Sequence, residues 1–206
     1  LTEVLVIASA LSVQDVRERP SDRQQAADQA HAQWKDVDSD FAALINLWRG
    51  FEEQRQALGS SALRSWCRKN FLNYLRLREW RDAHRQLVLI TRDLQLSSGD
   101  KAKGRSQLAG DPVAQANKPS SPTNDRQQAG SYKERELAEK DQAAQRAKGY
   151  AAVHKAILAG LLSQIGQKTE DGDYLGARQR RFWVHPSSVI GRKKPSWLMA
   201  AELVET

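Results

Sequence analysis

Apolar residues recur at helical spacing through the first half of the chain, most clearly between Arg64 and Leu87. Together with the preceding Leu63, that stretch carries apolar positions that lie four residues apart or beside one another: Trp66, Cys67, Phe71, Leu72 and Leu75. This spacing predicts a helix with one buried face, and we expect the chain to turn near Leu77–Glu79 before a further helix. The opposite face is mainly basic, so it is either a solvated surface or a contact for nucleic acid.

Similar periodicity predicts helices over residues 2–13, 21–34, 41–58 and 80–96. Small polar residues stand where these helices and the central one begin, and we expect them to act as caps: Thr2, Ser21, Ser39 or Asp40, and Ser60 or Ser61. Gly59 is expected to end the helix over residues 41–58. Four Trp residues are expected to share one core: Trp34, Trp48, Trp66 and Trp80. Residues 1–96 therefore read as one helical module.

The character of the chain changes after this module. Residues 97–146 are rich in Gly, Pro, Ser, Gln and Lys and hold few large apolar side chains, which predicts a disordered linker. Helical periodicity returns over residues 147–161, where Val153, Ile157 and Leu161 fall on one face. We expect this segment to be the last helix of the helical module.

Residues 162–206 contain short runs of β-type composition separated by turn sequences such as DGD, HPSS and GRKKP. This pattern is typical of a small meander of strands. The predicted fold class is therefore α+β in two modules, an all-α bundle followed by a small all-β module.

The 206 residues suffice for one or two domains, and the net charge of +7 favours anionic partners. A basic protein with no such partner is the plain alternative. The single Cys excludes an internal disulfide framework and suits a reducing compartment, so we expect a cytoplasmic protein. No apolar run approaches the length of a membrane span, and no membrane partner is expected.

A search for catalytic constellations finds no phosphate loop, no H-E-x-x-H pattern and no C-x-x-C pattern. The aspartates of KDVDSD at residues 35–40 have the spacing that opens an EF-hand. However, the loop's sixth and twelfth positions would be Phe41 and Leu47 instead of Gly and Glu, so we reject calcium and expect helix capping. Cys67 lies on the apolar stripe and reads as a buried structural thiol. We expect no catalytic residue, metal or cofactor in this chain.

A second basic segment lies between Gly176 and Lys194 and contains no acid: Arg178, Arg180, Arg181, Arg192, Lys193 and Lys194. Phe182 and Trp183 are interleaved with these cations, a composition that suits single-stranded nucleic acid. Neighbouring residues of a strand face opposite sides, so at most one of the two rings can stack on a base while the other joins the core. Both rings can also be structural.

Several segments resemble the helical C-terminal region of DEAH-box RNA helicases, in particular those of the bacterial HrpA type. They are VLVIASALSVQDVRERP, SDFAALINLW and WCRKNFLNYLRLREWRD. Three later segments resemble the OB-fold that follows in that family: VHKAILAGLLSQIG, YLGARQRRFWVHPSSVI and KPSWLMAAELVET. The resemblance covers about 150 of the 206 residues on both sides of the predicted linker.

This resemblance implies a ratchet-like helical domain beside an OB-fold, with the OB-fold truncated because the family continues past Thr206. In such helicases both domains line a channel for single-stranded RNA beside two RecA-like motor domains, which bind ATP and Mg²⁺. The motor motifs would lie upstream of Leu1, and we interpret the chain, which starts with Leu, as a fragment that neither binds nor hydrolyses ATP alone.

The resemblance also implies which residues meet RNA: Asn73, Arg76, Arg78, Arg178, Arg180, Arg181, His185, Ser187 and Ser188. Structural roles remain open for each of them, such as helix capping by Asn73 or turn formation at His185. The alternative function is a stand-alone module that binds nucleic acid or protein without a motor. We expect reversal of Arg180 and Arg181 to Glu to weaken RNA binding without unfolding, and Trp66→Ala to destabilise the core.

Overall fold

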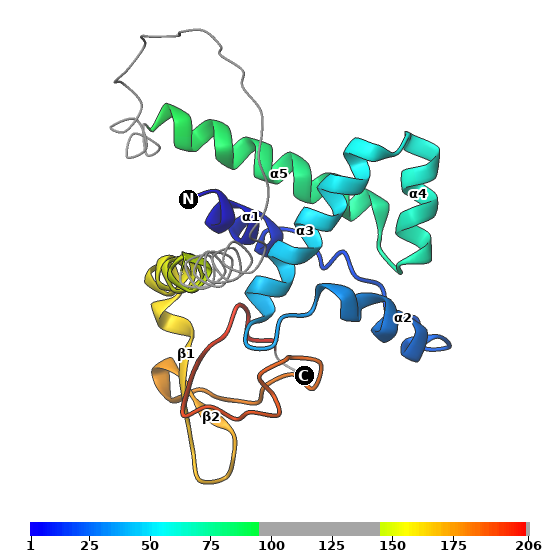
Figure 1. Cartoon of the computed structure of the whole chain (residues 1–206). Helices are drawn as coiled ribbons and strands as arrows, with labels where there is room; N and C mark the ends of the chain where they lie inside the picture. Colours follow the sequence, from blue (N-terminus) through cyan, green and yellow to red (C-terminus); the bar gives the residue numbers. More distant parts are fainter. Residues whose placement is uncertain (95–144, 205–206) are drawn as a thin grey trace, which may run out of the picture.

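The computed structural model describes residues 1–94 and 145–204, and Figure 1 shows helices grouped above a small sheet. The helices of the first part are α1 (Thr2–Leu11), α2 (Gln24–His31), α3 (Asp40–Ala57), α4 (Ser60–Lys69) and α5 (Tyr74–Asp93). A further helix occupies residues 145–160. The predicted α+β class, a helical part followed by a small β part, is confirmed. Most of the linker predicted over residues 97–146 lies outside the described residues.

Trp80 of α5 is the centre of the main helical core, with 1% of its surface exposed. Its indole Nε1–H donates to the Val6 carbonyl at 3.1 Å and to the Ser9 hydroxyl at 3.0 Å. The Trp48 ring from α3 packs against it at a centroid distance of 4.9 Å. Trp34 is also buried, and Trp66 packs on the cluster while partly exposed, so the predicted shared Trp core is confirmed.

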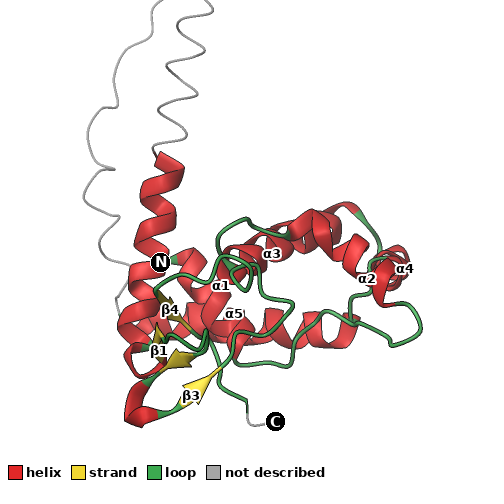
Figure 2. Ribbon diagram, turned by 90° about the horizontal axis from the view of Figure 1, so that it is seen from below, coloured by secondary structure: helices red, strands yellow, loops and turns green. Residues whose placement is uncertain are grey.

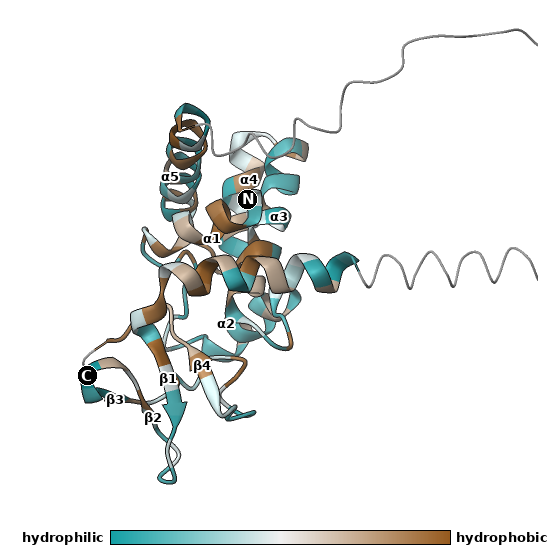
Figure 3. Cartoon of the chain, turned by 90° about the vertical axis from the view of Figure 1, so that its left-hand side faces the viewer, coloured by the Kyte–Doolittle hydropathy of each residue, from teal (hydrophilic) through white to brown (hydrophobic). Residues whose placement is uncertain are grey.

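A second apolar cluster joins α1, α3 and the helix over residues 145–160. Its buried members are Ile7, Phe41, Ile45, Val153 and Ile157, and Met199 of the sheet packs against them. Figure 3 shows apolar colour concentrated on α1 and on the inner end of the helix over residues 145–160. The sequence-distant parts of the chain are therefore held together by one continuous apolar contact. No helix within the described residues is long and apolar enough to cross a membrane.

The sheet has the order β3-β2-β1-β4, and each neighbouring pair is antiparallel (Figure 2). Its strands are β1 (Ile165–Lys168), β2 (Tyr174–Leu175), β3 (Arg181–Phe182) and β4 (Trp197–Met199). Gly166 leaves room for the Phe182 ring, because a Cβ at that position would come within 2.8 Å of Phe182 Cε1. Phe182 can therefore stack on the buried ring of Tyr174, at a centroid distance of 5.9 Å.

The break between α4 and α5 lies at Asn70–Asn73, so the turn predicted near Leu77–Glu79 is wrong. The segment pairs with an N-terminal strand-like stretch: Glu18 N–H donates to the Phe71 carbonyl at 2.8 Å, and Asn73 N–H donates to the Val16 carbonyl at 2.8 Å. These tertiary hydrogen bonds replace helical ones and place Phe71 at a φ of 52°.

The apolar stripe consequently changes phase at this break. Leu75, expected on the buried stripe, is 64% exposed, whereas Leu77 is fully buried. A helix that restarts after a turn presents a new set of residues to the core. A spacing of four residues across the turn therefore does not predict which residues are buried.

Helix capping was predicted correctly at one of the expected sites. Ser39 caps α3, with its hydroxyl accepting from Ala42 N–H at 3.3 Å. The other predicted N-caps are wrong, because Leu1 precedes α1, Arg23 precedes α2 and Gly59 precedes α4. Gly59 does follow the end of α3, as expected, directly after the C-cap Leu58. The predicted helix over residues 21–34 is α2 followed by the 3₁₀ turn Ala32–Trp34.

Candidate nucleic-acid interface

The connection between β2 and β3 carries two of the basic residues that the resemblance assigned to RNA, Arg178 and Arg180. Arg178 and Gln179 both hold left-handed backbone conformations there, with φ of 58° and 62°. Few non-glycine residues adopt this conformation, and two in succession reverse the chain sharply. The turn is closed by Gly176 N–H, which donates to the Arg180 carbonyl at 2.8 Å. The exposed Arg178 side chain therefore projects from the tip of the hairpin.

Arg181 of β3 is engaged within the sheet module. Its Nε donates to Asp173 Oδ2 at 2.5 Å, and its Nη2 donates to Asp171 Oδ2 at 2.6 Å. Asp173 is only 2% exposed and also accepts from the Thr169 hydroxyl. The hydrogen bonds from Arg181 and then Thr169 hold the pKa of Asp173 below its usual value, and the same contacts raise the pKa of Arg181.

Because of this ion pair, a substitution at Arg181 affects the stability of the sheet module as well as its surface charge. Reversal to Glu would leave the buried Asp173 carboxylate facing a second anion, which destabilises a folded protein strongly. Reversal of Arg180 and Arg181 to Glu would therefore not separate a loss of RNA binding from a loss of folding. Arg178, whose exposed side chain projects from the turn, is the cleaner position for a test.

The segment HPSSV follows β3 and separates its polar residues into two groups. His185 Nδ1 accepts from Ser187 N–H at 3.2 Å and lies 2.7 Å from the Ser187 hydroxyl, which forms a local turn on the exposed surface. Ser188 instead faces the helices, because its hydroxyl donates to Asp40 Oδ2 at 2.5 Å. Val189 N–H donates to the other Asp40 oxygen at 3.2 Å.

Asp36–Asp40, here termed the acidic docking segment, connects the helices to the sheet module. Asp36 Oδ1 accepts from the N–H groups of Asp38 and Ser39, at 2.9 and 3.0 Å, and fixes the local turn. Asp38 forms an ion pair with Lys193, and Asp40 holds Ser188 and Val189 as described. From the sequence these acids were expected only to cap a helix. Their partners lie about 150 residues away, and no local sequence pattern indicates them.

His154 adds a second polar link beside the acidic docking segment. Its Nε2 lies 2.6 Å from the Ser39 hydroxyl, and its Nδ1 lies 2.7 Å from the Tyr150 carbonyl oxygen. The ring also stacks on Tyr150 at a centroid distance of 4.1 Å and meets Phe41 edge-on at 6.2 Å. The helix over residues 145–160 is therefore fixed at the start of α3 by polar and aromatic contacts together.

Asn73 and Arg76 act as structural residues at the start of α5. The Asn73 side-chain oxygen accepts from the N–H groups of Leu75 and Arg76 at 3.0 and 3.1 Å, and its Nδ2 donates to Glu18 at 2.8 Å. Arg76 Nη1 donates to the Asp15 carbonyl at 2.9 Å. Arg78 is exposed on the same helix. The candidates of the sheet module and those of α5 therefore lie on separate elements of the structure.

Two exposed Trp side chains lie in the sheet module. Phe182 stacks on the buried Tyr174, whereas its neighbour Trp183 is 70% exposed, as the alternation of a strand predicts. Trp197 of β4 is 60% exposed and was not singled out in the sequence, although its position in SWLM indicated a strand.

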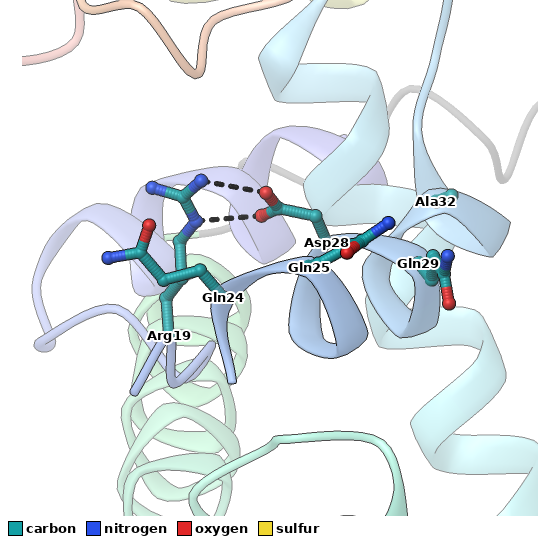
Figure 4. A pocket seen from close by; sticks show the side chains of 6 residues that line it. All are labelled: Arg19, Gln24, Gln25, Asp28, Gln29 and Ala32. Carbon is teal, nitrogen blue, oxygen red and sulfur yellow. Dashed lines mark hydrogen bonds and ion pairs between the residues drawn. The ribbon is translucent and has the colours of Figure 1, made fainter. Parts of the chain in front are cut away.

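Two hollows on the described surface have none of these candidates in their lining. One of about 550 Å³ is open and lined by Arg19, Gln24, Gln25, Asp28, Gln29 and Ala32. Figure 4 shows its Arg19 guanidinium bound through two parallel hydrogen bonds to Asp28, so that cation is engaged. Residues 1–94 and 145–204 contain no group of three or more His, Cys, Asp or Glu side chains placed to hold a metal. Cys67 is buried, and burial raises the pKa of its thiol to about 11.

Comparisons with known proteins agree with the two-part architecture. Residues 153–206 match the family model described as the oligonucleotide/oligosaccharide-binding (OB)-fold. The chain is 40% identical over 205 residues to the ATP-dependent RNA helicase HrpA of Escherichia coli and, at the same identity, to its homolog in Haemophilus influenzae. The ATP-dependent RNA helicase DHX33 of Drosophila melanogaster is 26% identical over 210 residues.

The coverage of these matches is unequal. They include 99% of this chain for the two bacterial proteins and 100% for the Drosophila protein, but only 12% and 22% of the lengths of those relatives. The predicted resemblance to DEAH-box helicases of the HrpA type is confirmed. The similarity is to a portion of such helicases that includes an OB-fold.

Proposed function

We propose that this chain is an accessory region of an ATP-dependent DEAH-box RNA helicase, and that it guides single-stranded RNA past motor domains in the rest of the parent protein. The observation that carries this proposal is the 40% identity to HrpA-type helicases over 99% of the chain. In this account ATP and Mg²⁺ bind the motor domains, which are the intramolecular partner, and this chain supplies no catalytic group.

The sheet module provides suitable chemistry for the proposed role. Exposed cations neutralise phosphates without reading sequence, and exposed rings stack on unpaired bases. Arg178 at the tip of the hairpin and Arg192 in the later loop are exposed cations, and Trp197 of β4 is an exposed ring. His185 and Ser187 add exposed polar groups in the loop that follows β3.

The helical part supports this role by holding the sheet module in place. Asp40 anchors the loop at Ser188, and Met199 packs into the cluster that contains Phe41 and Val153. A surface fixed in this way keeps its cations and rings at constant positions as RNA passes, which lowers the entropy lost on binding. We therefore assign Ser188 to positioning, and Arg178 to direct RNA contact.

The proposal is tested by charge reversal with a matched control. Arg178→Glu is compared with Arg92→Glu, which changes the net charge equally but lies in the last turn of α5. Binding of a fluorescent oligouridylate of about 12 nucleotides, a length within one OB-fold's site size, is measured by anisotropy at low salt. We expect several-fold weaker binding for Arg178→Glu and near wild-type binding for Arg92→Glu. Equal effects of the two variants would contradict a defined interface on the hairpin.

A further inference from the structure

One row of side chains crosses the sheet on its outer face. The strand register pairs Trp197 with Gln167, Gln167 with Leu175, and Leu175 with Arg181. Residues paired in register project to the same side, and their neighbours in sequence project to the other. The other side is the interior, because Tyr174 and Leu198 are buried there and Gly166 faces the Phe182 ring.

The two ends of this row differ in what they offer a ligand. Arg181 stands at one end and is already bound by two carboxylates, Asp171 and Asp173, so its positive charge is taken up within the protein. Trp197 stands at the other end with 60% of its surface exposed, next to the exposed amide of Gln167. Within residues 1–94 and 145–204 the Trp197 indole makes no hydrogen bond and no aromatic ring contact.

The position of Trp197 along β4 places it beside the helices. Met199 lies two residues further on the same strand, hence on the same face, and packs against the cluster of Ile7, Phe41 and Val153. The outer face is therefore covered at Met199 and open at Trp197. A flat ligand resting on the Trp197 ring would lie at the edge where the helical part ends.

A large exposed ring beside an amide is suited to a planar, hydrogen-bonding ligand. An indole face stacks on any nucleobase, and a Gln amide both donates to and accepts from base edges. Neighbouring strands are about 4.8 Å apart, so Gln167 is within reach of the edge of a base that covers Trp197. Trp183 lacks this arrangement because it lies after β3, outside the paired strands.

We propose that Trp197 and Gln167 form a stacking site for one unpaired nucleobase of single-stranded RNA on the outer face of β1 and β4. This assignment rests on the proposed function and adds a specific subsite to it. The ring holds the base, and the amide of Gln167 contacts its edge. Phosphate contacts come from cations elsewhere, so the subsite contributes affinity that does not depend on salt.

The test compares the two exposed Trp residues in the full chain. Trp197→Ala and the control Trp183→Ala are measured against an oligouridylate and against an oligomer of equal length and charge that lacks bases. We expect Trp197→Ala to bind the oligouridylate roughly 5- to 150-fold more weakly, since stacking contributes about 1–3 kcal/mol per base. Trp183→Ala should retain wild-type affinity, Trp197→Phe should recover part of the loss, and the abasic oligomer should not distinguish Trp197→Ala from wild type.

The outcomes separate this inference from the proposed function. If Trp197→Ala and Trp183→Ala lose no affinity, or lose it equally, the subsite is overturned. If the wild type still binds the oligouridylate in a salt-dependent way, the proposed function stands. Absence of wild-type binding to any oligomer at low salt would overturn both. Because Leu198 beside it is buried, folding of Trp197→Ala is checked by its melting transition, and Gln167→Ala provides a second variant on an exposed position. Should Trp197→Ala fail to fold, unchanged oligouridylate affinity in Gln167→Ala and Trp197→Phe would overturn the subsite.

Discussion

Replacement of Asp40 by Ala tests whether the acidic docking segment holds the sheet module to the helices. The substitution removes both acceptor oxygens that Ser188 Oγ–H and Val189 N–H use. Hydrogen bonds to a charged group contribute about 1.5–3 kcal/mol each, and an acid in the first turn of a helix adds about 0.5 kcal/mol. Partial exposure of the site reduces the sum, so we expect a loss of about 3 kcal/mol in the free energy that keeps this loop docked.

Hydrogen exchange at the Val189 amide is the appropriate measurement. A loss of about 3 kcal/mol corresponds to roughly 150-fold faster exchange where local opening governs it. Asp38→Ala is the matched control, because its ion pair with Lys193 is exposed and contributes about 0–1 kcal/mol. Unprotected exchange of the Val189 amide in the wild type, or an equal change of its exchange in both variants, would refute a docking role for Asp40.

Three further predictions concern stability and reactivity. Gly166→Ala should lower the free energy of unfolding by about 1–3 kcal/mol through steric overlap, whereas Gly149→Ala, with open space around it, should not; urea titration distinguishes them. Burial lowers the pKa of His31 and of His84, so their neutral forms favour the fold. Stability should be complete above about pH 6.5 and fall as the pH drops below it, measured by melting from pH 8 to about 5. Cys67, buried and with its pKa raised to about 11, should resist alkylation at neutral pH until the protein unfolds, as mass spectrometry would show.

Local sequence patterns were sufficient to predict most of the helices and the shared Trp core. Spacing alone predicted α3 as a helix and placed Val153 and Ile157 on one face, which is buried in the structure, because both depend only on the period of a helix. The turn at Asn70–Asn73 could not be predicted in this way. It depends on hydrogen bonds to Val16 and Glu18, about 55 residues earlier in the chain, which no local pattern encodes.

The candidate interface was predicted by composition and resemblance but not by geometry. The basic hairpin at Arg178 is exposed as expected, whereas Ser188 and Arg181 are engaged by acids whose positions only the folded chain reveals. Trp197 stood in a run that indicated a strand, yet nothing local distinguishes an exposed strand residue from a buried one when both are apolar. The strand register supplied that distinction.

Salt dependence of binding to single-stranded RNA tests the central claim most directly. If the chain guides RNA through about five phosphate contacts, log K should fall with log salt at a slope near −3.5, at about 0.7 per contact for single strands. Anisotropy titrations of an oligouridylate at several salt concentrations from about 50 to 200 mM give this slope. A slope near −3.5 is the result that the account predicts. Undetectable binding at the lowest salt, or an affinity indifferent to salt, would contradict it.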